Sequence, residues 1–331
     1  MLSSILIIQI LPNIVFRTIT IEARTVSSEH TYRPDVKHFE SELDRSTGYW
    51  SPSTSSIDWC ERNYVVTQYI AEFWNFLSSL VFCLLSGILF FQALYYRIEN
   101  RFLLLCLSYM FVGLGSAFFH GTLTYLGQMA DELSMIYSMI IWWFILFRMD
   151  KFNKIRNKMY RLDLGIVFAI FYGILWTYMH SLKTFIVIFQ VHFGLMVFGA
   201  MLKSIFIYRQ TQHRTRYIMC LITIYVTLLV PALTSWILDQ ELCERMNTAG
   251  GFNPQLHAWW HVFCAIDSHV GLVCTEAMRL LSIKYKLHKI KHADSSTRPF
   301  KPEDHLHIRF YFGLPYVDYS HEIQLKQPKQ Q

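Results

Sequence analysis

The sequence predicts an all-α protein built as a seven-transmembrane helix bundle, and three observations carry this prediction. Of its 331 residues, 53% are hydrophobic and only 16% are charged, and the mean hydropathy is +0.26. Soluble globular chains average about 25% charged residues, so this composition indicates lipid as the main solvent and excludes a disordered or collagen-like chain. Seven stretches are apolar enough to cross a hydrocarbon core of about 30 Å. The basic residues between these stretches fall mainly on one side.

The predicted spans follow one another along the chain with short connections. The sixth contains Pro231, which membrane helices tolerate when neighbouring groups satisfy the freed backbone. The seven stretches cover about 69–96, 102–120, 129–147, 162–180, 184–207, 217–238 and 257–283.

The connections predict the orientation of the bundle. Those after spans one, three and five hold twelve Lys and Arg residues, whereas the opposite short loops hold only Lys183 and Arg245. Because basic loops stay in the cytosol, the N-terminus is expected to be luminal or extracellular and the C-terminus cytosolic. The net charge of +6 then reflects the orientation of the bundle rather than a nucleic-acid partner, since no nucleic-acid-binding module is visible.

The chain outside the spans divides into three further parts. Residues 1–23 read as a signal peptide or hydrophobic leader, 24–48 as a flexible luminal extension, and 284–331 as a basic cytosolic tail. Residues 49–283 form the seven-helix domain. A multi-pass protein of the secretory pathway follows, in the endoplasmic reticulum, the Golgi or the plasma membrane, with its polar cluster toward the lumen or the outside.

Polar residues gather at the luminal ends of spans two, three and seven, where each is costly to keep in lipid. Ser116 and His120 lie one helical turn apart near the end of span two, and Asp131 begins span three. His257 and His261, at i and i+4, open span seven and can bind one metal ion. Span two rises about 28 Å from the cytosolic loop to His120, so topology alone places these residues at one depth.

This set predicts a catalytic zinc site rather than a structural one. Three neutral imidazoles leave a fourth position open on zinc, which lowers the pKa of bound water and polarises a carbonyl. Asp131 is a candidate general base, and Ser116 a candidate donor to an oxyanion. A lone membrane histidine is more often a packed residue, and Asp131 with Glu132 would also suit the positive end of a helix dipole.

A third polar cluster precedes the first span. Oxygen donors from Asp58, Glu61, Asn63 and Glu72, together with a backbone carbonyl, match the ligand preference of calcium. The spacing is not that of an EF-hand, so a solvated acidic turn is the alternative interpretation.

Five segments, taken together, make the chain resemble the alkaline ceramidase family over about residues 49–315. They are Ile57-Asp58-Trp59-Cys60-Glu61-Arg62-Asn63-Tyr64, Ile70-Ala71-Glu72-Phe73-Trp74-Asn75, Gly115-Ser116 with His120, Asp131-Glu132-Leu133-Ser134-Met135-Ile136-Tyr137, and His257-Ala258-Trp259-Trp260-His261.

The resemblance implies a seven-helix membrane amidase that cleaves the N-acyl bond of ceramide, taken from the bilayer, to sphingosine and a fatty acid. It implies catalytic roles for Asp131 and Ser116, and a disulfide between Cys60 and Cys243. It implies zinc at His120, His257 and His261, and calcium at Asp58, Trp59 through its main-chain oxygen, Glu61, Asn63 and Glu72.

Two polar residues of span seven depart from the family pattern. Asp267 and His269 lie one to two turns beyond His261 and are expected to face the pocket or each other.

Two alternatives to the enzyme stay open at this point. A zinc-containing receptor of the progestin and adiponectin type is similar, although its topology is inverted. A G-protein-coupled receptor or a transporter without metal is the other, and metal content would distinguish it.

Overall fold

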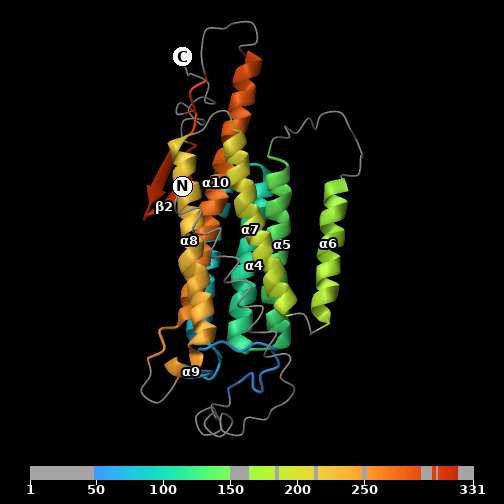
Figure 1. Cartoon of the computed structure of the whole chain (residues 1–331), viewed down its shortest axis with the longest axis vertical. Coiled ribbons are helices and arrows are strands. Elements are labelled where there is room, and N and C mark those ends of the chain that lie inside the picture. Colours follow the sequence, from blue (N-terminus) through green and yellow to red (C-terminus); the bar gives the residue numbers. More distant parts are fainter. Residues whose placement is uncertain are drawn as a thin grey trace.

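Long helices run side by side along the longest axis of the molecule (Figure 1). The computed structural model describes residues 48–149, 164–182, 186–211, 215–247, 252–291, 300–302 and 305–319. The helices are α3 (Phe73–Tyr95), α4 (Asn100–Thr122), α5 (Tyr125–Phe147), α6 (Leu164–Ser181), α7 (Ile186–Gln210), α8 (Arg216–Glu241), α9 (Cys243–Met246) and α10 (Leu256–Lys291).

Six helices, α3 to α8, are long and apolar enough to cross a membrane, which confirms the prediction of a helical multi-pass membrane protein. α10 has 36 residues, or about 54 Å of helix, but it is too polar to be recognised in the same way. It packs against α3 and α8 and supplies a large part of the buried core. A helix of sufficient length therefore covers the predicted seventh span and continues eight residues beyond the predicted end at 283.

Small residues let the central helices approach closely. A Cβ on Gly115 of α4 would lie 2.6 Å from the main-chain oxygen of Ala130 in α5, so that position excludes any larger side chain. A Cβ on Gly271 of α10 would lie 2.5 Å from the indole of Trp142. The Gly115 contact brings α4 against α5 near the histidines, and the Gly271 contact brings α10 against α5 in the middle of the bundle. Small residues commonly allow such close helix packing in membrane proteins.

α6 is attached much more loosely (Figure 1). Gly173 and His180 are its buried residues, and most of its large apolar side chains face outward. His180 pairs with Glu132 of α5, and Tyr125 donates a hydrogen bond of 3.3 Å to the main-chain oxygen of His180. Polar contacts therefore hold this helix more than packing does.

The segment assigned to the tail contains an element that was not predicted. Strands β1 (Ile308–Tyr311) and β2 (Leu314–Val317) form an antiparallel hairpin, and β2 packs on α10. The leader 1–23, the extension up to residue 47 and the end of the tail from residue 320 lie outside the described residues.

Candidate metal centre

Three histidines from two helices converge at one end of the bundle. His120 lies in the last turn of α4, while His257 and His261 occupy the first two turns of α10, and all three are buried. Their ligand nitrogens lie within 4.8 Å of one another, and the ring centroids are 4.6 to 5.2 Å apart. Within the described ranges, this is the one group of metal-ligating side chains gathered so tightly.

Neighbouring groups orient the three rings. The Nδ1 of His120 lies 2.5 Å from Oε2 of Glu72, and the Nδ1 of His261 lies 2.9 Å from the Ser78 hydroxyl. The His257 ring stacks on the Trp59 indole with centroids 3.6 Å apart. Nε2 of His120 and Nδ1 of His257 are buried and make no hydrogen bond within the described structure. Buried polar atoms are normally satisfied, so this donor set fits a metal ion that prefers imidazole.

Ser116 and Asp131 adjoin the histidines. The Ser116 hydroxyl lies 3.5 Å from Nε2 of His261, accepts a hydrogen bond of 3.0 Å from the Ser79 hydroxyl, and is a polar neighbour of the Asp131 carboxyl. The close contact at Gly115 explains this neighbourhood, because it brings α4 against the turn of α5 that carries Asp131. The helix-dipole interpretation of Asp131 and Glu132 is wrong, since α5 begins at Tyr125 and its first turn contains no acidic residue.

The predicted calcium residues also lie together, in the loop that covers this end of the bundle. Asn63 donates to both carboxylate oxygens of Asp58 at 3.2 and 3.3 Å, and the Trp59 main-chain nitrogen donates to Glu72 at 3.0 Å. The carboxylate of Glu61 accepts the main-chain N–H groups of Trp74 and Asn75 at 2.7 and 2.9 Å. Glu61 therefore satisfies the N-terminus of α3, a role that the sequence did not reveal.

Burial raises the pKa of Glu61 and of Glu72 to about 7. Like charge from Asp239 raises both pKa values further, although hydrogen bonds to each carboxyl oppose this. A nearby cation would favour the ionised form of both. Glu72 is the point of contact between the two predicted metal sites, because it also holds His120.

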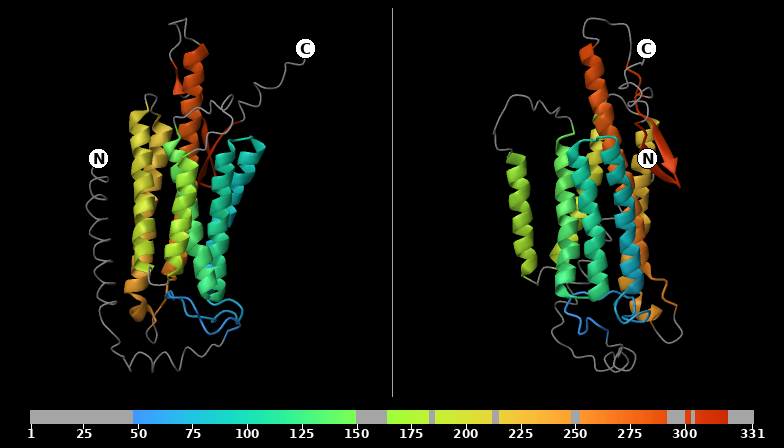
Figure 2. Two further views of the ribbon diagram at one scale, coloured as in Figure 1. Left: turned by 90° about the vertical axis from the view of Figure 1, so that its right-hand side faces the viewer. Right: turned by 180° about the vertical axis from the view of Figure 1, so that it is seen from behind.

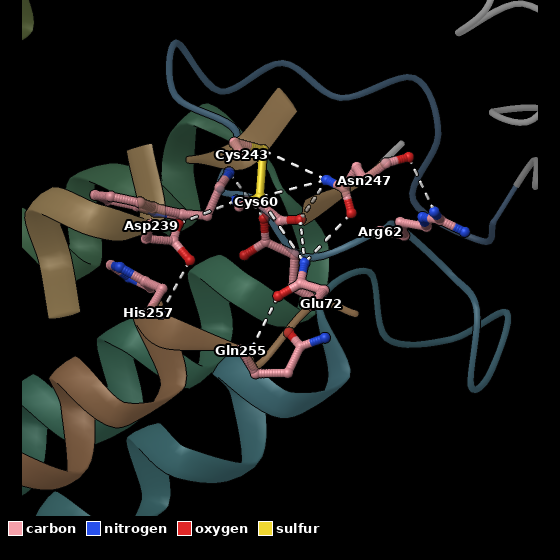
Figure 3. The surroundings of a disulfide bond; sticks show 10 residues. Cys60, Arg62, Glu72, Asp239, Cys243, Asn247, Gln255 and His257 are labelled. Carbon is pink, nitrogen blue, oxygen red and sulfur yellow. Dashed lines mark hydrogen bonds between the residues drawn. A yellow bond between two sulfur atoms is a disulfide. The ribbon is translucent and has the colours of Figure 1, made fainter. Parts of the chain in front are cut away.

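A disulfide joins Cys60 to Cys243, with Cα atoms 5.3 Å apart, as the family resemblance implied (Figure 3). Beside it lies Asp239, a buried residue of α8 that sequence reasoning missed. Its two carboxylate oxygens accept the main-chain N–H groups of Cys60 at 3.2 Å and of His257 at 3.1 Å. Asp239 thus fixes the start of α10 relative to the loop. In the sequence it is a single acidic residue near the end of a predicted span, which does not indicate this role.

Asp267 and His269 are buried, but the expectation that they face the pocket or each other is wrong for His269. Its Nε2 lies 3.0 Å from the main-chain oxygen of Pro315, so it faces the hairpin. Asp267 has a carboxylate oxygen with no hydrogen bond in the described structure, and its electrostatic neighbours are Tyr109 and Tyr225.

Comparison with known proteins identifies the family of the chain. The ceramidase family model matches residues 51–299. Alkaline ceramidase 3 of Mus musculus is 32% identical over 252 residues, covering 74% of this chain and 91% of the relative. An alkaline ceramidase of Arabidopsis thaliana is 30% identical over 226 residues, covering 68% and 84%. One from Saccharomyces cerevisiae is 31% identical over 253 residues, covering 71% and 80%. The chain therefore belongs to the ceramidase family.

Proposed function

We propose that this protein is a zinc-dependent membrane amidase that hydrolyses the N-acyl bond of ceramide, releasing sphingosine and a free fatty acid. Family membership and relatives named alkaline ceramidases support the reaction. The observation that carries the proposal is the buried group of three histidines with Ser116 and Asp131 beside it. Ceramide is an amphiphile of the bilayer, so it is taken from the surrounding lipid.

His120, His257 and His261 would hold the zinc ion. Zinc, when bound, acidifies a water molecule and polarises a carbonyl group. Glu72 accepts a hydrogen bond from Nδ1 of His120, which fixes the ring and leaves Nε2 directed at the metal position. Asp239 accepts the main-chain N–H of His257 and so fixes the backbone at this ligand, while the Trp59 indole stacks on its ring.

Asp131 and Ser116 would carry the proton transfer and the charge stabilisation. Asp131 is placed to take a proton from the attacking water and to deliver it to the leaving amine nitrogen. The hydroxyl of Ser116, between Asp131 and His261, is placed to donate a hydrogen bond to the oxygen of the cleaved amide. The sphingoid base then leaves as an amine and the acyl group as a carboxylate.

The loop over the site would bind a calcium ion that supports activity structurally. Glu72 carries the coupling, because it belongs to the calcium set and also orients His120. Under thorough chelation of calcium, wild-type activity should fall toward that of the Glu61→Ala variant. Full activity of Glu61→Ala under the same conditions would contradict this role. The proposed ligands are Asp58, the main-chain oxygen of Trp59, Glu61, Asn63 and Glu72.

The proposed topology has seven spans, with α10 as the seventh. The polar face of α10 is tolerable in the membrane because α3 and α8 cover it. The positive-inside asymmetry supports a luminal N-terminus and a cytosolic C-terminus, so the site opens toward the lumen or the outside of a secretory-pathway membrane. Membership of the ceramidase family favours an enzyme over the receptor and transporter alternatives.

The test is lipid analysis of the detergent-purified full chain incubated with a panel of ceramides differing in acyl length and sphingoid base. We expect sphingoid base and fatty acid in equal amounts from the wild type. His257→Ala should release none while keeping its helical circular dichroism. A wild-type preparation that binds zinc but cleaves no ceramide in the panel would overturn the proposal.

A further inference from the structure

The C-terminal hairpin presents three consecutive aromatic side chains at its tip. Phe310, Tyr311 and Phe312 are 55%, 68% and 91% exposed. The turn needs positive φ at both central residues, which are Phe312 at 49° and Gly313 at 80°. Asn or Gly usually occupies the first of these positions, since a bulky residue there is strained. A phenylalanine in a strained and 91% exposed position raises the question of what this side chain contacts.

The hairpin is held firmly against the bundle by its second strand. Gln92 of α3 donates a hydrogen bond of 2.9 Å to the main-chain oxygen of Val317. The imidazole of His269 in α10 lies 3.0 Å from the main-chain oxygen of Pro315. Just beyond the strand, the Tyr319 hydroxyl donates to Glu276 of α10 at 2.5 Å. Two membrane-bundle helices thus fix the direction in which the tip points.

The hairpin lies beside the candidate span α3 rather than beyond the helices. Tyr311 and Leu314 line a hollow of about 390 Å³ together with Ile88, Phe91 and Tyr95 of α3. α3 is a candidate span, and Phe91 and Tyr95 are 67% and 73% exposed on its outer face. Figure 2 shows the strands on the outside of the bundle, toward the end opposite the loop that covers the histidines. The aromatic tip is therefore continuous with a lipid-facing helix surface.

We propose that Phe310, Tyr311 and Phe312 insert into the bilayer leaflet opposite the histidine site, so that the hairpin is a phospholipid-binding anchor. Aromatic side chains concentrate at the boundary between headgroups and hydrocarbon. That boundary also suits the outer edge of β1, whose unpaired backbone groups cannot enter the hydrocarbon core. The adjoining Arg309 is paired with Asp318 at 2.7 Å, so the tip carries no free charge that would favour water.

Photocrosslinking of the full chain in phosphatidylcholine vesicles tests the proposal. Benzoylphenylalanine replaces Phe312 in one variant. It replaces Phe91, on the lipid-facing side of α3, as a positive control, and Tyr49, a 69% exposed residue of the opposite loop, as a negative control. We expect phospholipid adducts from position 312 at a yield close to that from position 91 and well above that from position 49. Adducts only with a second copy of the chain would overturn the proposal.

A second variant guards against disturbance of the turn. Phe310 lies in β1 with extended backbone, so benzoylphenylalanine there leaves the strained residue in place. Lipid adducts at position 310 would support the anchor even if the first variant misfolds. Absence of lipid adducts at position 310 in a protein that retains its Cys60–Cys243 disulfide, with adducts still formed at position 91, would refute it.

Discussion

α6 and α10 differ in both polarity and burial. α6 is apolar along its length, and its large side chains, such as Phe168 and Phe171 at 65% and 64% exposure, face outward. α10 is the most polar of the long helices, yet it is surrounded by α3 and α8 and contributes Val273, Ala277 and Leu281 to the core. The candidate span with the smallest buried share, α6, is thus an apolar helix, whereas the most polar long helix is packed into the core.

This difference follows from the solvent. A helix that faces lipid on most sides must be apolar, so its sequence indicates that it lies in the membrane but marks no functional residues. A helix covered by its neighbours can carry ionisable groups, and α10 carries two of the three histidines at one end and the hairpin contacts of His269 and Glu276 further along. Polar residues that lower the hydropathy of a span therefore mark its buried, functional face.

The largest expected effect is the loss of a metal ligand from α10. His261→Ala should abolish zinc binding and lower ceramide hydrolysis more than about 100-fold, since even partners of metal ligands cost 10- to 100-fold. His288→Ala, on the same helix but far from the triad, is the matched control and should retain metal and activity. Zinc content of purified protein and sphingosine release measure both. Equal activities of the two variants would remove α10 from the site.

Two neighbouring acidic residues of α5, Asp131 and Glu132, are expected to have different roles: the first in catalysis, the second in holding α6. Asp131→Asn should lower kcat by about 10²- to 10⁴-fold with zinc retained, because a general base is lost. Glu132→Gln should retain most of the activity of the remaining folded protein but lower its thermal stability, since Glu132 pairs with His180 of α6. Wild-type-like turnover by Asp131→Asn would contradict its catalytic role.

Truncation of apolar side chains should distinguish the two helices in stability. Leu281→Ala in α10, where the side chain is 1% exposed, should cost about 2–5 kcal/mol of unfolding free energy. Phe171→Ala in α6 should change it by less than about 0.5 kcal/mol, as substitutions of exposed residues usually do. Unfolding in detergent, followed by circular dichroism, provides the comparison. Equal destabilisation would mean that α6 is packed in a way that the structure lacks.

The smallest effect comes from adding one methyl group. Gly271→Ala should cost about 1–3 kcal/mol, because the new Cβ meets the Trp142 ring. Gly194→Ala in α7, where no atom lies within 4 Å, should be stabilising by up to about 1 kcal/mol through helix propensity. Because the two variants should change stability in opposite directions, the sign of each shift in melting temperature is sufficient for the test. A stabilising Gly271→Ala would contradict the tight packing of α10.

The sequence was sufficient for the histidine group because its spacing and depth are local signals. His257 and His261 are one turn apart, and the alternation of loops placed His120 at the same end of the bundle. The role of Asp239 could not be predicted, since it depends on two N–H groups far away in the chain. The hairpin was missed because its strands have four residues each and are stabilised by helices rather than by their own pattern.

The contact between Glu72 and His120 was also beyond sequence reasoning. Both residues were assigned to metal sites, but to different ones; the predicted topology puts the start of α3 and the end of α4 at the same end of the bundle, and only the packed structure brings these two side chains into contact. The same holds for Gly115, whose importance depends on the main-chain oxygen of Ala130. Patterns identify candidate ligands, whereas close backbone approaches decide which of them meet.

A metal titration of the purified protein, with activity measured in parallel, tests whether ceramide hydrolysis depends on zinc. Zinc is removed with a chelator, calcium is kept in excess, and zinc is returned in steps while bound metal and sphingosine release are measured. We expect bound zinc and sphingosine release to rise together and to saturate near one zinc per chain, with neither rise in His257→Ala. Ceramide hydrolysis that persists undiminished in zinc-free protein would contradict it.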